Sequence, residues 1–115
     1  MLSLLMLKKK TMSDKLKYEE AIIQGLKTVF DPEIPVNVYD LGLIYKIEVL
    51  DSMDVEVEMT LTAPGCPVAD YILNEVKEKV EMVPDIKTCT VNLVFEPAWD
   101  KDMMSEAAQL ELGML

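Results

Sequence analysis

The chain has 115 residues, half of them hydrophobic, a length and composition that suit one globular domain with a true core. Its formal net charge is −10, which argues against nucleic acid or an anionic membrane surface as the main partner. No apolar run approaches the roughly 20 residues that a bilayer-spanning helix needs.

The cysteine and histidine content narrows the chemistry. There are two cysteines and no histidine, which excludes a disulfide scaffold, a Cys–His or Ser–His catalytic pair and a histidine-based zinc site. The features of a secretory signal are not present at the start of the chain. We therefore expect a cytoplasmic protein, with residues 1–12 as a disordered or non-native extension and residues 13–115 as the single domain.

The first predicted helix covers about residues 13–29. Four residues recur at helical spacing on one face: Tyr18, Ile22, Leu26 and Val29. Ser13 or Asp14 is expected to cap the helix, and the Asp31–Pro32 step to end it, because a residue before proline avoids helical dihedral angles.

A connection of about twelve residues, Asp31 to Gly42, comes next. Long ordered loops are often functional, and two prolines stiffen this one. It carries three carboxylates, those of Asp31, Glu33 and Asp40. These acids are either solvated or capping groups, or hard oxygen ligands beside a thiolate, a mixture that iron tolerates.

Two strands are predicted at about residues 43–50 and 53–62, separated by a turn at Asp51–Ser52. One face of the first strand should hold Leu43, Tyr45, Ile47 and Val49. The second strand alternates apolar residues with acids in the clearest period of two in the chain: Met53, Val55, Val57, Met59 and Leu61 against Asp54, Glu56 and Glu58. Together they predict an antiparallel hairpin with one buried face.

A second helix is predicted at about residues 67–82, with an apolar stripe formed by Val68, Ile72, Val76, Val80 and Val83. A third strand, at about residues 86–95, should bury Cys89, Val91, Leu93 and Phe95 on one side. A short helix, at about residues 102–112, should end at Gly113. The order α-β-β-α-β plus a short C-terminal helix predicts an α/β two-layer sandwich, with the strand order left open.

Cys66 lies in the sequence TLTAPGCP, where a strand gives way to a helix. Pro67 suits the first helical position, which leaves Cys66 at or beside the N-cap. Unpaired amide N–H groups and the helix dipole there would stabilise thiolate over thiol, so Cys66 is either a reactive or metal-binding cysteine or an inert buried one. Cys89, in phase with Val91 and Leu93, is expected in the core.

Three further features have alternative interpretations. Thr60 and Thr62 are either ordinary polar strand residues, or Thr62 donates a hydrogen bond to the Cys66 sulfur or to a bound ligand. Carboxylates near Cys66 would raise its pKa unless a metal neutralises them, which favours metal binding over free-thiol chemistry. Trp99 either seals one end of the core or joins the neighbouring methionines in a partner-binding patch.

Three long motifs resemble one family: DPEIPVNVYDLGLIY at residues 31–45, MTLTAPGCP at 59–67 and FEPAWDKDMMSEAAQLELG at 95–113. They are similar to the SufT and PaaD group of metal–sulfur cluster biosynthetic proteins, relatives of the eukaryotic cytosolic iron–sulfur assembly factors. The segment after the tryptophan looks more like the SufT side. The resemblance implies a compact α/β sandwich like the C-terminal domain of NifU.

The resemblance also implies a role in the maturation of iron–sulfur proteins, as a non-catalytic carrier or adaptor. Cys66 would be the transient ligand of iron or of a cluster, with Thr62, Asp31, Glu33 and Asp40 in the same site. No cofactor is expected in the isolated protein, and its partners would be the assembly machinery and apo client proteins, with a homodimer possible in principle. The alternatives are a thiol-dependent sulfur transferase with Cys66 as nucleophile, and a pure protein-interaction adaptor.

Overall fold

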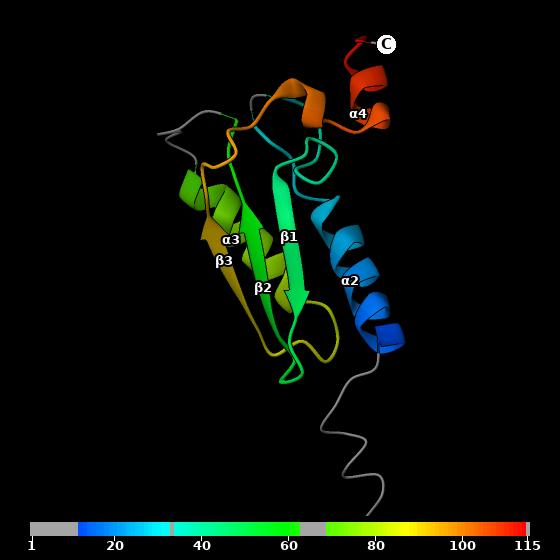
Figure 1. Ribbon diagram of the computed structural model, residues 1–115, viewed down its shortest axis with the longest axis vertical. Coiled ribbons are helices and arrows are strands. Elements are labelled where there is room, and N and C mark those ends of the chain that lie inside the picture. The colour runs from blue at the N-terminus through cyan, green and yellow to red at the C-terminus, as the bar shows by residue number, and fades with distance from the viewer. Residues whose placement is uncertain (1–11, 33, 63–68, 115) are drawn as a thin grey trace, which may run out of the picture.

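The computed structural model describes residues 12–32, 34–62 and 69–114 (Figure 1). Its elements follow the predicted order: α2 (Met12–Leu26), β1 (Ile44–Val49), β2 (Asp54–Met59), α3 (Ala69–Glu81), β3 (Thr88–Leu93), the 3₁₀ helix η1 (Lys101–Met103) and α4 (Glu106–Glu111). The α/β class and the two-layer arrangement are confirmed.

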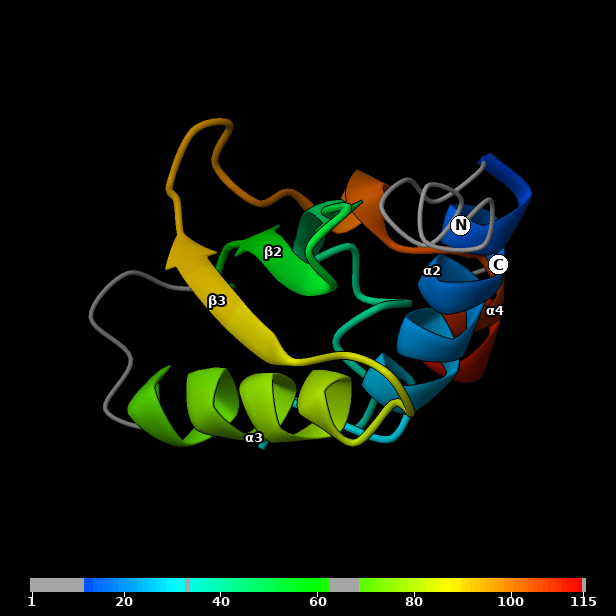
Figure 2. The same ribbon diagram turned by 90° about the horizontal axis from the view of Figure 1, so that it is seen from below.

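The sheet has the order β1-β2-β3. β1 and β2 pair antiparallel as the predicted hairpin, whereas β2 and β3 pair in parallel through the crossover helix α3. Figures 1 and 2 show α3 against one face of the sheet and α2 alongside β1, so that these two helices leave the other face open.

The core lies between the sheet and the helices, where the predicted periodicities place it. Val55, Val57 and Met59 of β2 are at most 1% exposed, while the acids that alternate with them face solvent or are half-buried. Most of the predicted stripes of the two long helices are also buried: Ile22 and Leu26 in α2, with Val29 after it, and Ile72, Val76 and Val80 in α3. Tyr18 and Val83 are half-buried, and Val68 lies outside the described residues. The connection before β1 adds Val36, Val38 and Leu41 to the core.

The predicted face of β1 is wrong at Tyr45. The register with β2 shifts between Ile44 and Lys46, which marks a β-bulge. Tyr45 therefore leaves the buried face: its hydroxyl donates to the Pro97 carbonyl at 2.7 Å and lies 3.6 Å from the Met103 sulfur.

Three smaller predictions also need correction. α2 begins at Met12, so Ser13 and Asp14 lie inside its first turn instead of capping it. Phe95, predicted on the buried face of the third strand, is 44% exposed. β3 ends at Leu93, so Phe95 lies beyond the strand whose alternation was expected to bury it. Thr60, predicted on a polar strand face, is only 1% exposed.

The predicted C-terminal helix is broken into two. Asp100 caps η1 by accepting from the Asp102 amide, and Ser105 caps α4 by accepting from the Ala108 amide at 3.1 Å. The end of α4 is as predicted: Gly113 has φ +74° at the C′ position. A Schellman pair of hydrogen bonds closes it, from Gly113 to the Leu110 carbonyl and from Met114 to the Gln109 carbonyl.

Gly42 is required by its surroundings. Its φ is +82°, which favours glycine, and a Cβ at this position would overlap the backbone carbonyl of Met103. The turn before β1 can therefore pack directly against η1 only because residue 42 has no side chain.

We expect Gly42→Ala to lower the free energy of unfolding by about 2 kcal/mol or more, since the left-handed penalty of about 1–2 kcal/mol adds to the overlap with Met103. Gly113→Ala carries the left-handed penalty alone, because a Cβ at residue 113 would meet nothing within 4 Å. Gly25→Ala, inside α2 and with only ordinary contact to Lys79, should stabilise by about 0.5–1 kcal/mol. Urea denaturation of the three variants measures these differences, and equal losses for Gly42 and Gly113 would show that the Met103 contact yields easily.

Candidate functional site

Three segments that are distant in sequence meet at one end of the sheet. Because β1 runs antiparallel to β2 and β3, the connection that enters β1 and the segments that leave β2 and β3 share that end (Figure 1). Hydrogen bonds join them: Thr60 N–H to the Leu43 carbonyl, Val94 N–H to Met59 and Ser105 N–H to Asp40, each at 2.8 Å. The described parts of the three motifs singled out in the sequence thus form one structural unit.

Trp99 is part of this unit. Its indole N–H donates to the Leu41 carbonyl at 2.7 Å, and its partly buried ring packs against the core. This contact agrees with the core-sealing interpretation. Met104 is buried at 7% exposure, so of the two adjacent methionines only Met103, at 37%, contributes to the surface.

Asp31 and Asp40 both shape the connection. Asp31 is 6% exposed, and its Oδ1 accepts from the Ile34 amide at 3.0 Å. Asp40 Oδ2 accepts from the Asn37 side-chain amide at 2.8 Å, while the Asp40 amide donates to Asn37 Oδ1 at 2.9 Å. Such local bonds fold a loop by replacing helix or sheet pairing. A further role of either carboxylate as a ligand stays a prediction.

Thr60 and Thr62 differ in their surroundings. Thr62 is half-buried and is the last described residue before the segment that carries Cys66. Thr60 is buried, and its Oγ1 has no hydrogen-bond partner within the described residues. Sequence reasoning missed this burial because Thr60 continues the polar phase of β2, and its apolar neighbours gave no signal, since Glu56 and Glu58 also lie between apolar residues.

The remaining predicted residues, Cys66 and Glu33, lie outside the described residues, as do Pro67 and the expected N-cap geometry. The structure thus brings Asp31, Asp40 and Thr62 to one end of the sheet and leaves the other two untested. In the part of the chain that is described, no three Cys, Asp or Glu residues are grouped so as to hold a metal ion.

Cys89 is a core thiol, as predicted. It is 2% exposed, and its backbone amide donates to Glu81 Oε2 at 2.9 Å. Burial raises the pKa of its thiol to about 11, the Glu81 carboxylate adding to the rise while Lys77 acts in the opposite direction. The thiol is therefore protonated and shielded at neutral pH.

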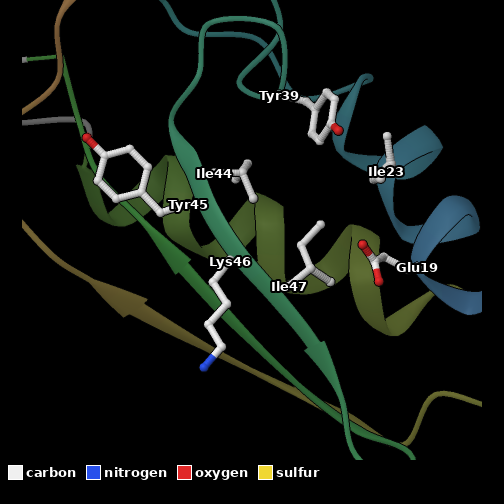
Figure 3. Close-up of a pocket in the computed structure, with 7 residues that line it drawn as sticks. All are labelled: Glu19, Ile23, Tyr39, Ile44, Tyr45, Lys46 and Ile47. Atoms are coloured by element: carbon white, nitrogen blue, oxygen red, sulfur yellow. The ribbon is translucent and has the colours of Figure 1, made fainter. Parts of the chain in front are cut away.

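Two hollows flank the start of β1. One, of about 160 Å³, lies between Glu19 and Ile23 of α2 and Ile44 and Ile47 of β1, with Tyr39 above it (Figure 3). Figure 3 also shows Tyr45 projecting from β1 on the side away from α2.

The second hollow, of about 520 Å³, lies on that other side. The bulged start of β1, Glu58 of β2, and Glu96, Pro97 and Met103 of the segment after β3 line it. Both hollows are therefore close to the end of the sheet where the three motifs meet.

These features define a small α/β domain in which three motif-bearing segments gather at one end of the sheet. Residues 19–93 match the family model described as iron–sulfur cluster assembly protein, and the chain belongs to that family. The resemblance to SufT-like proteins inferred from the motifs is confirmed.

Two bacterial relatives match nearly their whole length. An Fe–S protein maturation auxiliary factor of Porphyromonas gingivalis is 59% identical over 100 residues, which cover 87% of this chain and 95% of the relative. The Fe–S protein maturation auxiliary factor SufT of Staphylococcus aureus is 43% identical over 86 residues, covering 75% and 98%.

Solved structures agree on the fold. A domain of unknown function, DUF59, from Bacillus anthracis superposes with a TM-score of 0.84 at 32% identity, covering 91% of this chain and 100% of that domain. A conserved hypothetical protein from Thermotoga maritima gives 0.71 at 34% identity, covering 92% and 97%. As for membranes, none of the described helices combines the length and apolarity needed to cross one.

The two thiols should differ sharply in reactivity. With a pKa of about 11, on the order of one Cys89 thiol in a few thousand is ionised at pH 7.5, and burial further limits access. We expect iodoacetamide to modify one cysteine of the native protein, Cys66, and to reach Cys89 only after unfolding. Mass spectrometry of alkylated peptides across a pH series checks both statements. An apparent pKa at or above about 8.5 for Cys66 would contradict the stabilised thiolate.

Proposed function

We propose that this protein is a maturation factor for iron–sulfur proteins that holds iron or a cluster transiently through Cys66. The observation that carries the proposal is the convergence of the three motifs on the end of the sheet from which the Cys66 segment departs. That segment lies between Thr62, just after β2, and Ala69, at the start of α3. Relatives of the chain, named as Fe–S protein maturation auxiliary factors, support the same role.

A shortage of thiolates favours transfer over storage. Iron–sulfur clusters are commonly held by four thiolates, whereas this chain has two cysteines, of which Cys89 is buried in the core. The ligands that Cys66 cannot supply would come from a second copy, from the assembly machinery or from the apo client. A cargo held by so few ligands from one protein leaves readily when a client offers a complete set.

The connection supports such loose binding. Asp31 and Asp40 use carboxylate oxygens for hydrogen bonds within their own loop, so they compete less strongly for the cargo. Thr60 and Thr62 bring hydroxyl groups to the end of β2, and a hydroxyl donor favours the thiolate form of a neighbouring cysteine. Glu33 remains a candidate oxygen ligand in this proposal.

The same features favour a carrier over an enzyme. The sequence has no histidine to serve as a general base for Cys66. The family and the names of the relatives point to assembly and maturation rather than to turnover of a metabolite.

The test is anaerobic reconstitution with ferrous iron and sulfide, in wild-type protein and in the variants Cys66→Ser and Cys89→Ala. We expect visible cluster absorption in the wild type, its loss in Cys66→Ser, and retention in Cys89→Ala, because the Cys89 thiol is buried and protonated. Transfer to an apo ferredoxin, followed by the recovery of its own absorption, measures delivery.

Other outcomes would replace the proposal. With a low-molecular-weight persulfide as sulfane-sulfur donor and no metal, formation of a persulfide on Cys66 that then passes its outer sulfur to an acceptor thiol would identify a sulfur transferase. Full client maturation by Cys66→Ser in depleted cells would identify an interaction adaptor in which the thiol plays no part.

A further inference from the structure

The open face of the sheet is strongly acidic. Its strand positions alternate with the core positions and carry Lys46, Glu48, Asp54, Glu56, Glu58, Thr88, Thr90 and Asn92. Glu48 and Glu56 lie directly opposite each other across β1 and β2, an arrangement that disfavours the isolated sheet. A positive partner on this face would relieve that repulsion.

The acidic face ends in the hollow of about 520 Å³ beside Tyr45, which is within the size range of pockets that hold small molecules or a single side chain. Pro97 and Met103 contribute apolar side chains to its wall. Glu58 and Glu96 supply two carboxylates.

Neither carboxylate is matched by a cation. Within the described residues, the carboxylates of Glu58 and Glu96 have no ion pair and no hydrogen bond. Lys46, which lies opposite Glu58, pairs with Glu48 at 3.7 Å instead. Elsewhere the chain provides such partners: Lys77 bonds to Glu81 at 2.7 Å, and Thr88 and Ser52 donate to Asp54.

The position of the hollow is fixed by the fold. Its outer wall is the segment after β3, which Tyr45 holds through the Pro97 carbonyl and which the Gly42–Met103 contact holds at its other end. The apolar side chains of that wall suit the aliphatic part of a long side chain, and the carboxylates suit its charged end.

We propose that this hollow binds a lysine or arginine side chain of a protein partner, with the acidic face of the sheet attracting the basic surface around it. The proposal deepens the proposed function, on which it rests for the identity of the partner as a client or assembly protein. Cation binding itself requires neither Cys66 nor a cluster.

The test titrates the ¹⁵N-labelled full chain at low ionic strength with N-acetyl-arginine amide, and with N-acetyl-citrulline amide as its neutral counterpart. We expect saturable shifts of the Tyr45, Glu58 and Glu96 amides with the arginine compound and not with citrulline. Glu58→Gln combined with Glu96→Gln should weaken binding about two- to thirtyfold, as expected for the loss of two exposed or partly exposed charge pairs.

A matched control comes from α3. Glu75 and Glu78 line a hollow of about 440 Å³ that also contains Lys79, so the same charge change can be made where a cation is already present. Glu75→Gln combined with Glu78→Gln should change binding less than twofold. Equal weakening by both double variants, or shifts spread over every acidic surface, would overturn the proposal, as would no shift at the hollow.

Reconstitution separates this inference from the proposed function. The Glu58→Gln, Glu96→Gln protein should take up a cluster like the wild type but deliver it more slowly at low salt to a client with a basic surface. Normal cluster uptake by a protein that does not bind the arginine compound would refute the cation-binding role of the hollow and leave the carrier role intact. Failed uptake by the wild type would refute the carrier role.

Discussion

The close approach of Gly42 to the Met103 backbone is the constraint on which the end of the sheet that gathers the three motifs depends. It brings η1 against the turn that enters β1, and the Ser105–Asp40 hydrogen bond continues the same seam. Trp99 then reaches the Leu41 carbonyl, and Tyr45 reaches Pro97. The segment after β3 therefore crosses the end of the sheet where the three motifs meet. There it covers part of the core and forms one wall of the hollow that Glu58 and Glu96 line.

The elements with a single buried face could be predicted from the sequence. β2 and α3 each have a single apolar contact surface, so the spacing of their apolar residues is enough to predict which side chains are buried in the core. Cys89 follows the same rule, since it shares its phase with Val91 and Leu93. Gly113 was equally predictable, because a left-handed residue after the last helical turn is a local requirement.

What the sequence did not reveal depends on contacts with distant segments. The bulge at Tyr45 directs its hydroxyl to Pro97, 52 residues away. Thr60 is buried although its phase is polar, and the C-terminal helix breaks at Ser105, whose amide donates to Asp40. In the candidate site, the motifs singled out the segments that the structure brings together, but not the hydrogen bonds of Asp31 and Asp40 within their own loop.

In this chain of net charge −10, the carboxylates of the connection before β1 and those of the open sheet face have different surroundings. In the connection, Asp31 and Asp40 accept hydrogen bonds from donors of their own loop, which engage the carboxylates but leave them charged. Glu56 and Glu58 on the open face, and Glu96 in the adjoining hollow, have no ion pair with any described cation. Carboxylates are therefore engaged locally in the connection and left without a cation on the open face. Under the two proposals, the open face would attract a basic client, while Asp31 and Asp40 would stay bonded within their own loop and leave the cargo to Cys66.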